Sequence, residues 1–135
     1  MNYIDTDVLI HYLVIQDAAL NVKAIDMIDK MIIDNLFSIS WLSIQETGFV
    51  LSKLNQPNSL IFSKLNFLMS CSPVQYSKIE FARAVELAEI ISFKNFNDCL
   101  HLAIAEQHCT DFYTCNHKDF KKLQSHTNLT IHFFQ

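Results

Sequence analysis

Short apolar runs alternate with amphipathic segments of helical periodicity along the whole chain. The runs that predict buried strands are residues 2–4, 36–40, 74–76, 112–114 and 130–134. The segments that predict helices are residues 8–14, 18–34, 41–54, 59–70, 78–92 and 96–107. Because parallel strands need long crossover connections, usually helices, this alternation predicts a parallel sheet with helices on both faces.

The bulk composition predicts one folded domain over residues 1–135, because half of the residues are hydrophobic. A net charge of −4 argues against tight, sequence-blind binding to long duplexes. The four cysteines form no C-x-x-C pair, so neither a zinc site nor a disulfide framework is expected. The N-terminus does not resemble a secretory signal, and no apolar run is long enough to predict a membrane span. We therefore expect a soluble cytoplasmic protein.

Four acidic residues are predicted to reach one end of the sheet from distant parts of the chain. Asp5 follows the first strand, Glu46 lies on the helix after the second, and Asp98 lies in the first turn of a helix. Asp119 lies shortly after the strand that ends near Thr114. Ligands of parallel sheets gather at the carboxyl ends of the strands. Carboxylates there would bind Mg²⁺ or Mn²⁺, and a bound metal could activate water for phosphodiester hydrolysis.

Each of these acids also has an ordinary structural interpretation. Asp5 could cap the helix that follows it, and Glu46 completes a capping-box pattern that begins at Ser43. Asp98 could interact favourably with a helix dipole. Asp119 lies among lysines, where a solvated surface charge is the equal alternative.

Three segments resemble the PIN-domain nucleases, and within them the VapC-like toxins. These segments are Tyr-Ile-Asp-Thr-Asp-Val-Leu-Ile at residues 3–10, Asn-Asp-Cys-Leu-His-Leu-Ala-Ile-Ala at 97–105 and Tyr-Thr-Cys-Asn-His-Lys-Asp-Phe at 113–120. The resemblance covers essentially the whole chain. It implies a Rossmann-like, three-layer α/β/α fold with a central, mainly parallel sheet. It also implies a Mg²⁺- or Mn²⁺-dependent endoribonuclease that forms a homodimer and is neutralised by a cognate antitoxin protein.

The same resemblance implies roles for individual residues. Asp5, Glu46 and Asp98 match the catalytic, metal-binding acids of the family. Many relatives have a fourth acid where this chain has Asn116, which leaves two alternatives: Asp119 takes part, directly or through water, or the site runs on three acids. Asp7, Thr114 and Asn116 are candidates for orienting the metal ligands.

Several other residues have both a functional and a structural interpretation. Lys94, Lys118, Lys121 and Lys122 flank the acidic motifs and are candidates for guiding the RNA backbone, with a solvated cluster as the equal alternative. Trp41 and the eleven phenylalanines are expected in the core rather than as base-stacking platforms, and His101 is expected near Asp98. The apolar segment 54–67 suggests an interface with an antitoxin or a second subunit, although core packing is favoured.

Three other functions remain open from the sequence. One is a housekeeping RNA-processing nuclease of the same fold. Another is a binding module on a PIN scaffold that has lost catalysis, suggested by Asn116. The last is a phosphoacceptor receiver-like domain, which ranks lowest because no acidic pair and no downstream active-site lysine are evident.

Overall fold

A computed structural model describes residues 1–135 and contains one sheet of four parallel strands. The strands, in chain order, are β1 (Asn2–Ile4), β2 (Phe37–Ser38), β3 (Asp111–Thr114) and β4 (Thr130–Phe133). Their order across the sheet is β2-β1-β3-β4, so β1 and β3 are the central pair. In the register, Tyr3 lies beside Ser38 on one side and Phe112 on the other. The predicted parallel sheet is confirmed.

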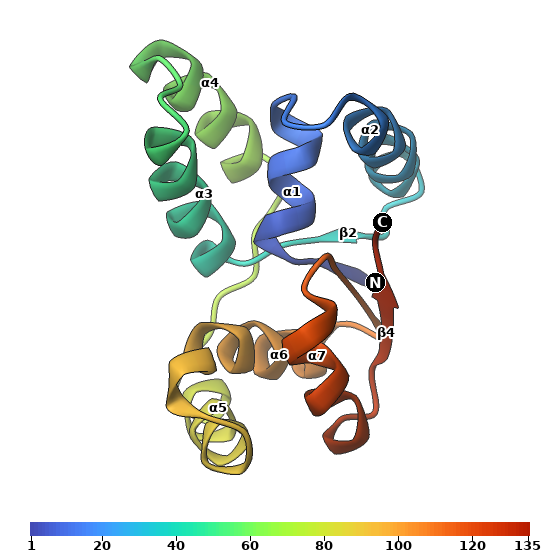
Figure 1. Cartoon of the computed structure of the whole chain (residues 1–135), viewed down its shortest axis with the longest axis vertical. Helices are drawn as coiled ribbons and strands as arrows, with labels where there is room; N and C mark the ends of the chain where they lie inside the picture. Colours follow the sequence, from blue (N-terminus) through green and yellow to red (C-terminus); the bar gives the residue numbers. More distant parts are fainter.

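Seven α-helices cover the two faces of this sheet. They are α1 (Thr6–Leu13), α2 (Ala18–Ile33), α3 (Trp41–Lys53), α4 (Asn58–Met69), α5 (Lys78–Ile90), α6 (Phe96–His108) and α7 (His117–Leu123). Figure 1 shows α1 to α4 on one side of the strands and α5 to α7 on the other. Short 3₁₀ turns at Phe93–Asn95 and Gln124–His126 connect neighbouring elements. The fold is therefore the predicted three-layer α/β/α arrangement.

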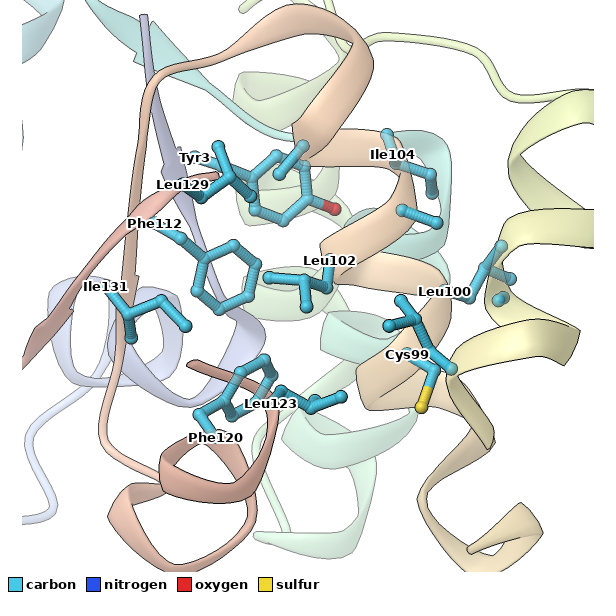
Figure 2. Packing of buried hydrophobic residues seen from close by; sticks show 14 of the residues in the cluster. Tyr3, Cys99, Leu100, Leu102, Ile104, Phe112, Phe120, Leu123, Leu129 and Ile131 are labelled. Atoms are coloured by element: carbon cyan, nitrogen blue, oxygen red, sulfur yellow. The ribbon is translucent and has the colours of Figure 1, made fainter. Parts of the chain in front are cut away.

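The central strands separate two hydrophobic cores because successive side chains of a strand point to opposite faces. Tyr3 belongs to the core under α5, α6 and α7, whereas its neighbour Ile4 belongs to the core under α1 to α4. In the first core, the rings of Tyr3 and Phe112 stack with centroids 5.4 Å apart. Figure 2 shows Phe120 and Leu102 beside Phe112 in the same cluster. This packing anchors β1 and β3 side by side, and it thereby positions the residues that follow them.

Several local expectations are wrong. Residues 74–76 do not form a strand, because only Val74 pairs, in a single bridge to Ser40. Helix α7 was not anticipated: Asn116 caps it by accepting a hydrogen bond from the backbone amide of Asp119. Trp41 is 42% exposed at the first position of α3, so it is not a core residue.

The phenylalanines divide between core and surface. Phe37, Phe112, Phe120 and Phe134 are buried, as expected. Large exposed fractions are found instead for Phe49, Phe62, Phe67, Phe81 and Phe93. No single helix is long and apolar enough to cross a membrane; only α1 and α2 together reach that length and composition, as a pair bent by 102°.

Candidate active site

Asp5 occupies the point where β1 ends and α1 begins, at the carboxyl edge of the sheet. Its side chain is buried and accepts a hydrogen bond from the backbone amide of Thr6, so the predicted cap is present. The hydroxyl of Thr114, at the end of β3, donates to Asp5 Oδ2 at 2.8 Å and contacts Asp7 Oδ2 at 3.3 Å. Asp7 also accepts from the backbone amide of Cys115. The two central strands thus bring Asp5, Asp7 and Thr114 together.

Glu46 projects toward this edge from α3. The capping box of α3 is formed by Ser40 and Ser43, so the interpretation of Glu46 as a capping residue is wrong. The helix begins one turn earlier than that interpretation required, and Glu46 lies beyond its first turn. Its carboxylate accepts hydrogen bonds from Thr6 Oγ1 at 2.6 Å and from Asn97 Nδ2 at 3.1 Å.

His101 is the residue whose role the sequence analysis missed. It is fully buried on α6, and its Nε2 lies 2.5 Å from Glu46 Oε1 and 4.0 Å from Asp5 Oδ1. Its Nδ1 is hydrogen-bonded to the hydroxyl of Tyr3 at 2.7 Å. Burial opposes a charge here, but Tyr3, Glu46 and Asp5 raise the pKa of His101 well above its ordinary value. The available signal was its position three residues after Asp98, which places both on one face of α6.

Asp98 lies in the first turn of α6, as predicted, and meets the residues that follow β3. Asn116 Nδ2 is 3.3 Å from Asp98 Oδ2 and 2.9 Å from Asp119 Oδ2, so this amide bridges the two carboxylates. Asn116 therefore donates to Asp98, and its role in orienting a metal ligand stays a prediction. Asp119 is joined to the acidic group through Asn116 rather than directly.

The acids sit in an environment that disfavours their charges. Burial, followed by repulsion from Asp7, raises the pKa of Asp5 from 3.8 to about 7. Burial likewise raises the pKa of Asp98 to about 6, with His101 acting in the opposite direction and further repulsion from neighbouring carboxylates adding to the rise. Glu46 differs: burial would raise its pKa, but the hydrogen bond and charge of His101 and further donors keep the pKa below its ordinary value. Asp5 and Asp98 are thus the acids whose charged forms would gain most from a bound cation.

One cavity of about 500 Å³ is lined by Asp5, Asp7, Glu46 and Asp98, but not by Asp119. Its lining residues are Asp5, Thr6, Asp7, Ile10, His11, Gln16, Glu46, Phe49, Val50, Asn97 and Asp98. A larger hollow of about 1040 Å³ lies between α5, the end of α6 and the starts of β3 and β4. It contains none of the predicted residues, and its Arg83 and Glu106 already form an ion pair at 2.9 Å. The smaller cavity is therefore the candidate active site.

Lys94, Lys118, Lys121 and Lys122 are all exposed, and none of them forms an ion pair or lines the acidic cavity. Their contact with RNA stays a prediction.

The donor set suits a hard, hydrated cation. No three His, Cys, Asp or Glu side chains have a geometry that would ligate one metal ion directly. The carboxylates of Asp5, Glu46 and Asp98 are instead hydrogen-bonded to Thr114, His101 and Asn116, respectively. Mg²⁺ keeps several of its waters and needs only one or two protein carboxylates. Asp5 and Asp98 present carboxylate oxygens with raised pKa values in the same cavity. These residues fit Mg²⁺ or Mn²⁺ bound in part through water.

Acids gathered at the carboxyl edge of a parallel sheet, between two layers of helices, define a class of α/β domain with a polar site at the strand ends. The family model of the PIN domain matches residues 3–125, and the chain therefore belongs to the PIN domain family.

Two solved structures share the fold over nearly the whole chain. The crystal structure of VapBC2 from Rickettsia felis bound to a DNA fragment from their promoter is similar with a TM-score of 0.73 and 20% identity, covering 100% of both chains. The structure of FitAB bound to an IR36 DNA fragment is similar with a TM-score of 0.71 and 15% identity, covering 98% of this chain and 94% of that one. No curated protein sequence matches this chain significantly.

Proposed function

We propose that the protein is a Mg²⁺- or Mn²⁺-dependent endoribonuclease. The observation that carries this proposal is that Asp5, Glu46 and Asp98, from three distant parts of the chain, line one cavity at the carboxyl edge of the sheet. The raised pKa values of Asp5 and Asp98 support it, since a divalent cation would stabilise the charged carboxylates, which burial and, secondarily, repulsion between neighbouring acids disfavour. Membership of the PIN family agrees with a nuclease.

The residues of the chain have distinct tasks in this proposal. Asp5 and Asp98 would hold the cation, and Glu46 would complete its acidic surroundings, in part through water. When bound, the metal would lower the pKa of a water molecule and stabilise charge on the leaving oxygen. The hydroxyl of Thr114 fixes the orientation of Asp5, and His101 fixes that of Glu46.

Polar residues around these acids would also contribute to the site. Asn116 holds Asp98 and Asp119 together, so Asp119 would act on the cation through water. Asp7 is anchored to the backbone after β3 and adds negative charge beside Asp5. The four exposed lysines would attract the RNA backbone from outside the cavity.

We further propose that the nuclease is the toxin of a toxin–antitoxin pair, acts as a homodimer and is neutralised by a cognate antitoxin. The similar structures, VapBC2 and FitAB, each carry the name of a pair of proteins. This supports a protein partner for the chain. The exposed apolar residues of α4, including Phe62, Phe67 and Met69, supply surface for such a contact. Four free cysteines suit the reducing cytoplasm. Growth arrest on expression, relieved by the product of an adjoining gene, would separate a toxin from a housekeeping nuclease.

A binding module without catalysis is the second candidate, because Asn116 stands where many relatives have an acid and donates to two carboxylates. Titration calorimetry with Mn²⁺ discriminates between the two, since the nuclease is expected to bind the metal and the scaffold is not.

The proposed activity is tested by RNA cleavage with Mg²⁺ and with EDTA. We expect cleavage by the wild type in Mg²⁺ only, and none by Asp5→Asn or Asp98→Asn. Asp26→Asn, an exposed acid of α2, is the matched control and should cleave like the wild type. Full cleavage by either of the first two variants would remove these residues from the reaction.

A further inference from the structure

An exposed phenylalanine stands at the mouth of the acidic cavity. Phe49 is 64% exposed, and it lines the same cavity as Asp5, Glu46 and Asp98. It lies three residues after Glu46 on α3, so the ring and the carboxylate share one face of that helix. The ring therefore offers an apolar platform directly beside the proposed site of hydrolysis.

Lys53 lies one turn farther along the same face of α3. Its Nζ is 5.2 Å from the centre of the Phe49 ring, and no carboxylate pairs with it. Glu46, Phe49 and the unpaired Lys53 thus lie in succession along one face of α3. A nucleotide has the matching parts, because its base presents an aromatic face and its phosphate a negative charge.

The rest of the cavity agrees with a nucleotide. Ile10 and Gln16 line it from α1 and the loop that follows, and Val50 lines it from α3. Figure 1 shows α1 and α3 next to each other, and the two helices are in contact. Apolar side chains suit the flat face of a base, and the Gln16 amide can both donate to and accept from a base edge.

We propose that Phe49 and Lys53 form a stacking site for one unpaired nucleobase of single-stranded RNA, adjacent to the phosphate to be cleaved. The inference rests on the proposed function for the position of that phosphate, and it adds the residues that would hold the neighbouring base. A paired base cannot use the ring, because both of its faces are already stacked in a duplex. An apolar protein partner would bury the unpaired Lys53 charge, which a phosphate neutralises instead.

Affinity for a short fluorescent single-stranded RNA, measured by anisotropy in EDTA so that the RNA stays intact, tests the ring. Loss of one base–aromatic stack weakens binding by about 5- to 150-fold, and we expect a loss in this range for Phe49→Ala. Phe49→Tyr should retain the affinity, because tyrosine stacks equally well. Phe81→Ala is the matched control, since Phe81 is 48% exposed on α5 but does not line the cavity. Stacking does not involve the 2′-hydroxyl, so single-stranded DNA should show the same dependence on Phe49.

The salt dependence of binding tests the lysine. Removing one phosphate contact to a single strand lowers the slope of log affinity against log salt by about 0.7, and Lys53→Gln should show this reduction. Lys30→Gln, an exposed lysine of α2 that does not line the cavity, should leave the slope unchanged.

The outcomes separate this inference from the proposed function. Phe49-dependent binding of single strands, with weaker and Phe49-independent binding of duplexes, supports the stacking site. If Phe49→Ala binds RNA like the wild type, the inference is wrong, and an altered oligomeric state or lost antitoxin binding in that variant would identify the ring as a protein contact. RNA that is bound through Phe49 but never cleaved in Mg²⁺ would refute the nuclease and not the stacking site.

Discussion

Replacing Asp98 by asparagine is expected to stabilise the metal-free protein at alkaline pH. Burial, with repulsion from Asp119, Asp7 and Glu46 and partial relief from His101, raises the pKa of Asp98 from 3.8 to about 6. Between these two values the folded state binds more protons than the unfolded state, so this carboxyl stabilises the fold below about pH 4 and its contribution is lost as pH rises through about 6.

The magnitude follows from the gap between the two pKa values. That gap corresponds to about 3 kcal/mol, and solvent screening of a partly exposed group reduces it to roughly 1–2 kcal/mol. An asparagine keeps an oxygen to accept the hydrogen bond from Asn116 and carries no charge. The variant should therefore unfold at a temperature roughly 3–8 °C above that of the wild type at pH 8.

Thermal unfolding followed by circular dichroism in EDTA measures this difference. The two proteins should differ little near pH 4 and increasingly up to about pH 7. Mg²⁺ should then stabilise the wild type more than the variant at pH 8. Asp26→Asn, which changes an exposed acid, controls for the altered net charge. A variant less stable than the wild type at pH 8 in EDTA would show that the Asp98 carboxylate is not under electrostatic strain, and the reasoning would fail.

Three further predictions follow from the same structure. Mn²⁺ affinity measured by calorimetry should fall as pH drops below about 7, because protons then compete at Asp5 and Asp98; equal affinity at pH 6 and pH 8 would contradict this. His101→Ala should slow cleavage by about 10- to 100-fold, because it removes the hydrogen bond that orients Glu46. The double variant His101→Ala/Glu46→Gln should then cleave no more slowly than Glu46→Gln alone. Additive losses in the double variant would show that His101 has a separate role. Phe112→Ala should lower the free energy of unfolding in urea by about 3–5 kcal/mol, whereas a loss below about 1 kcal/mol would mean that the central core is repacked.

The sequence was sufficient for the layers of the fold and for the convergence of the acids. Helical periodicity alternating with short apolar runs admits few topologies, and a parallel sheet places residues that follow different strands at one edge. Asp5 and Thr114 meet for this reason, since each marks the carboxyl end of a central strand. The position of Asp98 near these residues follows from the start of α6 at the same carboxyl edge of the sheet, since Asp98 lies in the first turn of that helix.

The failures concern features that local pattern does not determine. Glu46 matched a capping box that begins at Ser43, but the helix starts at Trp41, as its predicted bounds required, and its capping box is formed by Ser40 and Ser43. His101 lies close enough to Asp98 to lower its pKa, as expected, but the sequence did not indicate that its two ring nitrogens connect Tyr3 to Glu46, residues far apart in sequence.

The sequence also did not predict which aromatic side chains are exposed. Composition assigned phenylalanines to the core, yet Phe49 and Phe62 are largely exposed because helices α3 and α4 pack with other faces inward. Hydrophobicity shows that burial of a side chain is favourable, but it does not show which side chains the fold buries.

A crystal structure of the protein soaked in Mn²⁺, with the metal located by its anomalous scattering, tests the central claim most directly. We expect a peak inside the acidic cavity, coordinated by carboxylate oxygens of Asp5 and Asp98 directly or through a shared water. A fully occupied Mn²⁺ site elsewhere, with these two carboxylates still bonded only to Thr114 and Asn116, would contradict the account.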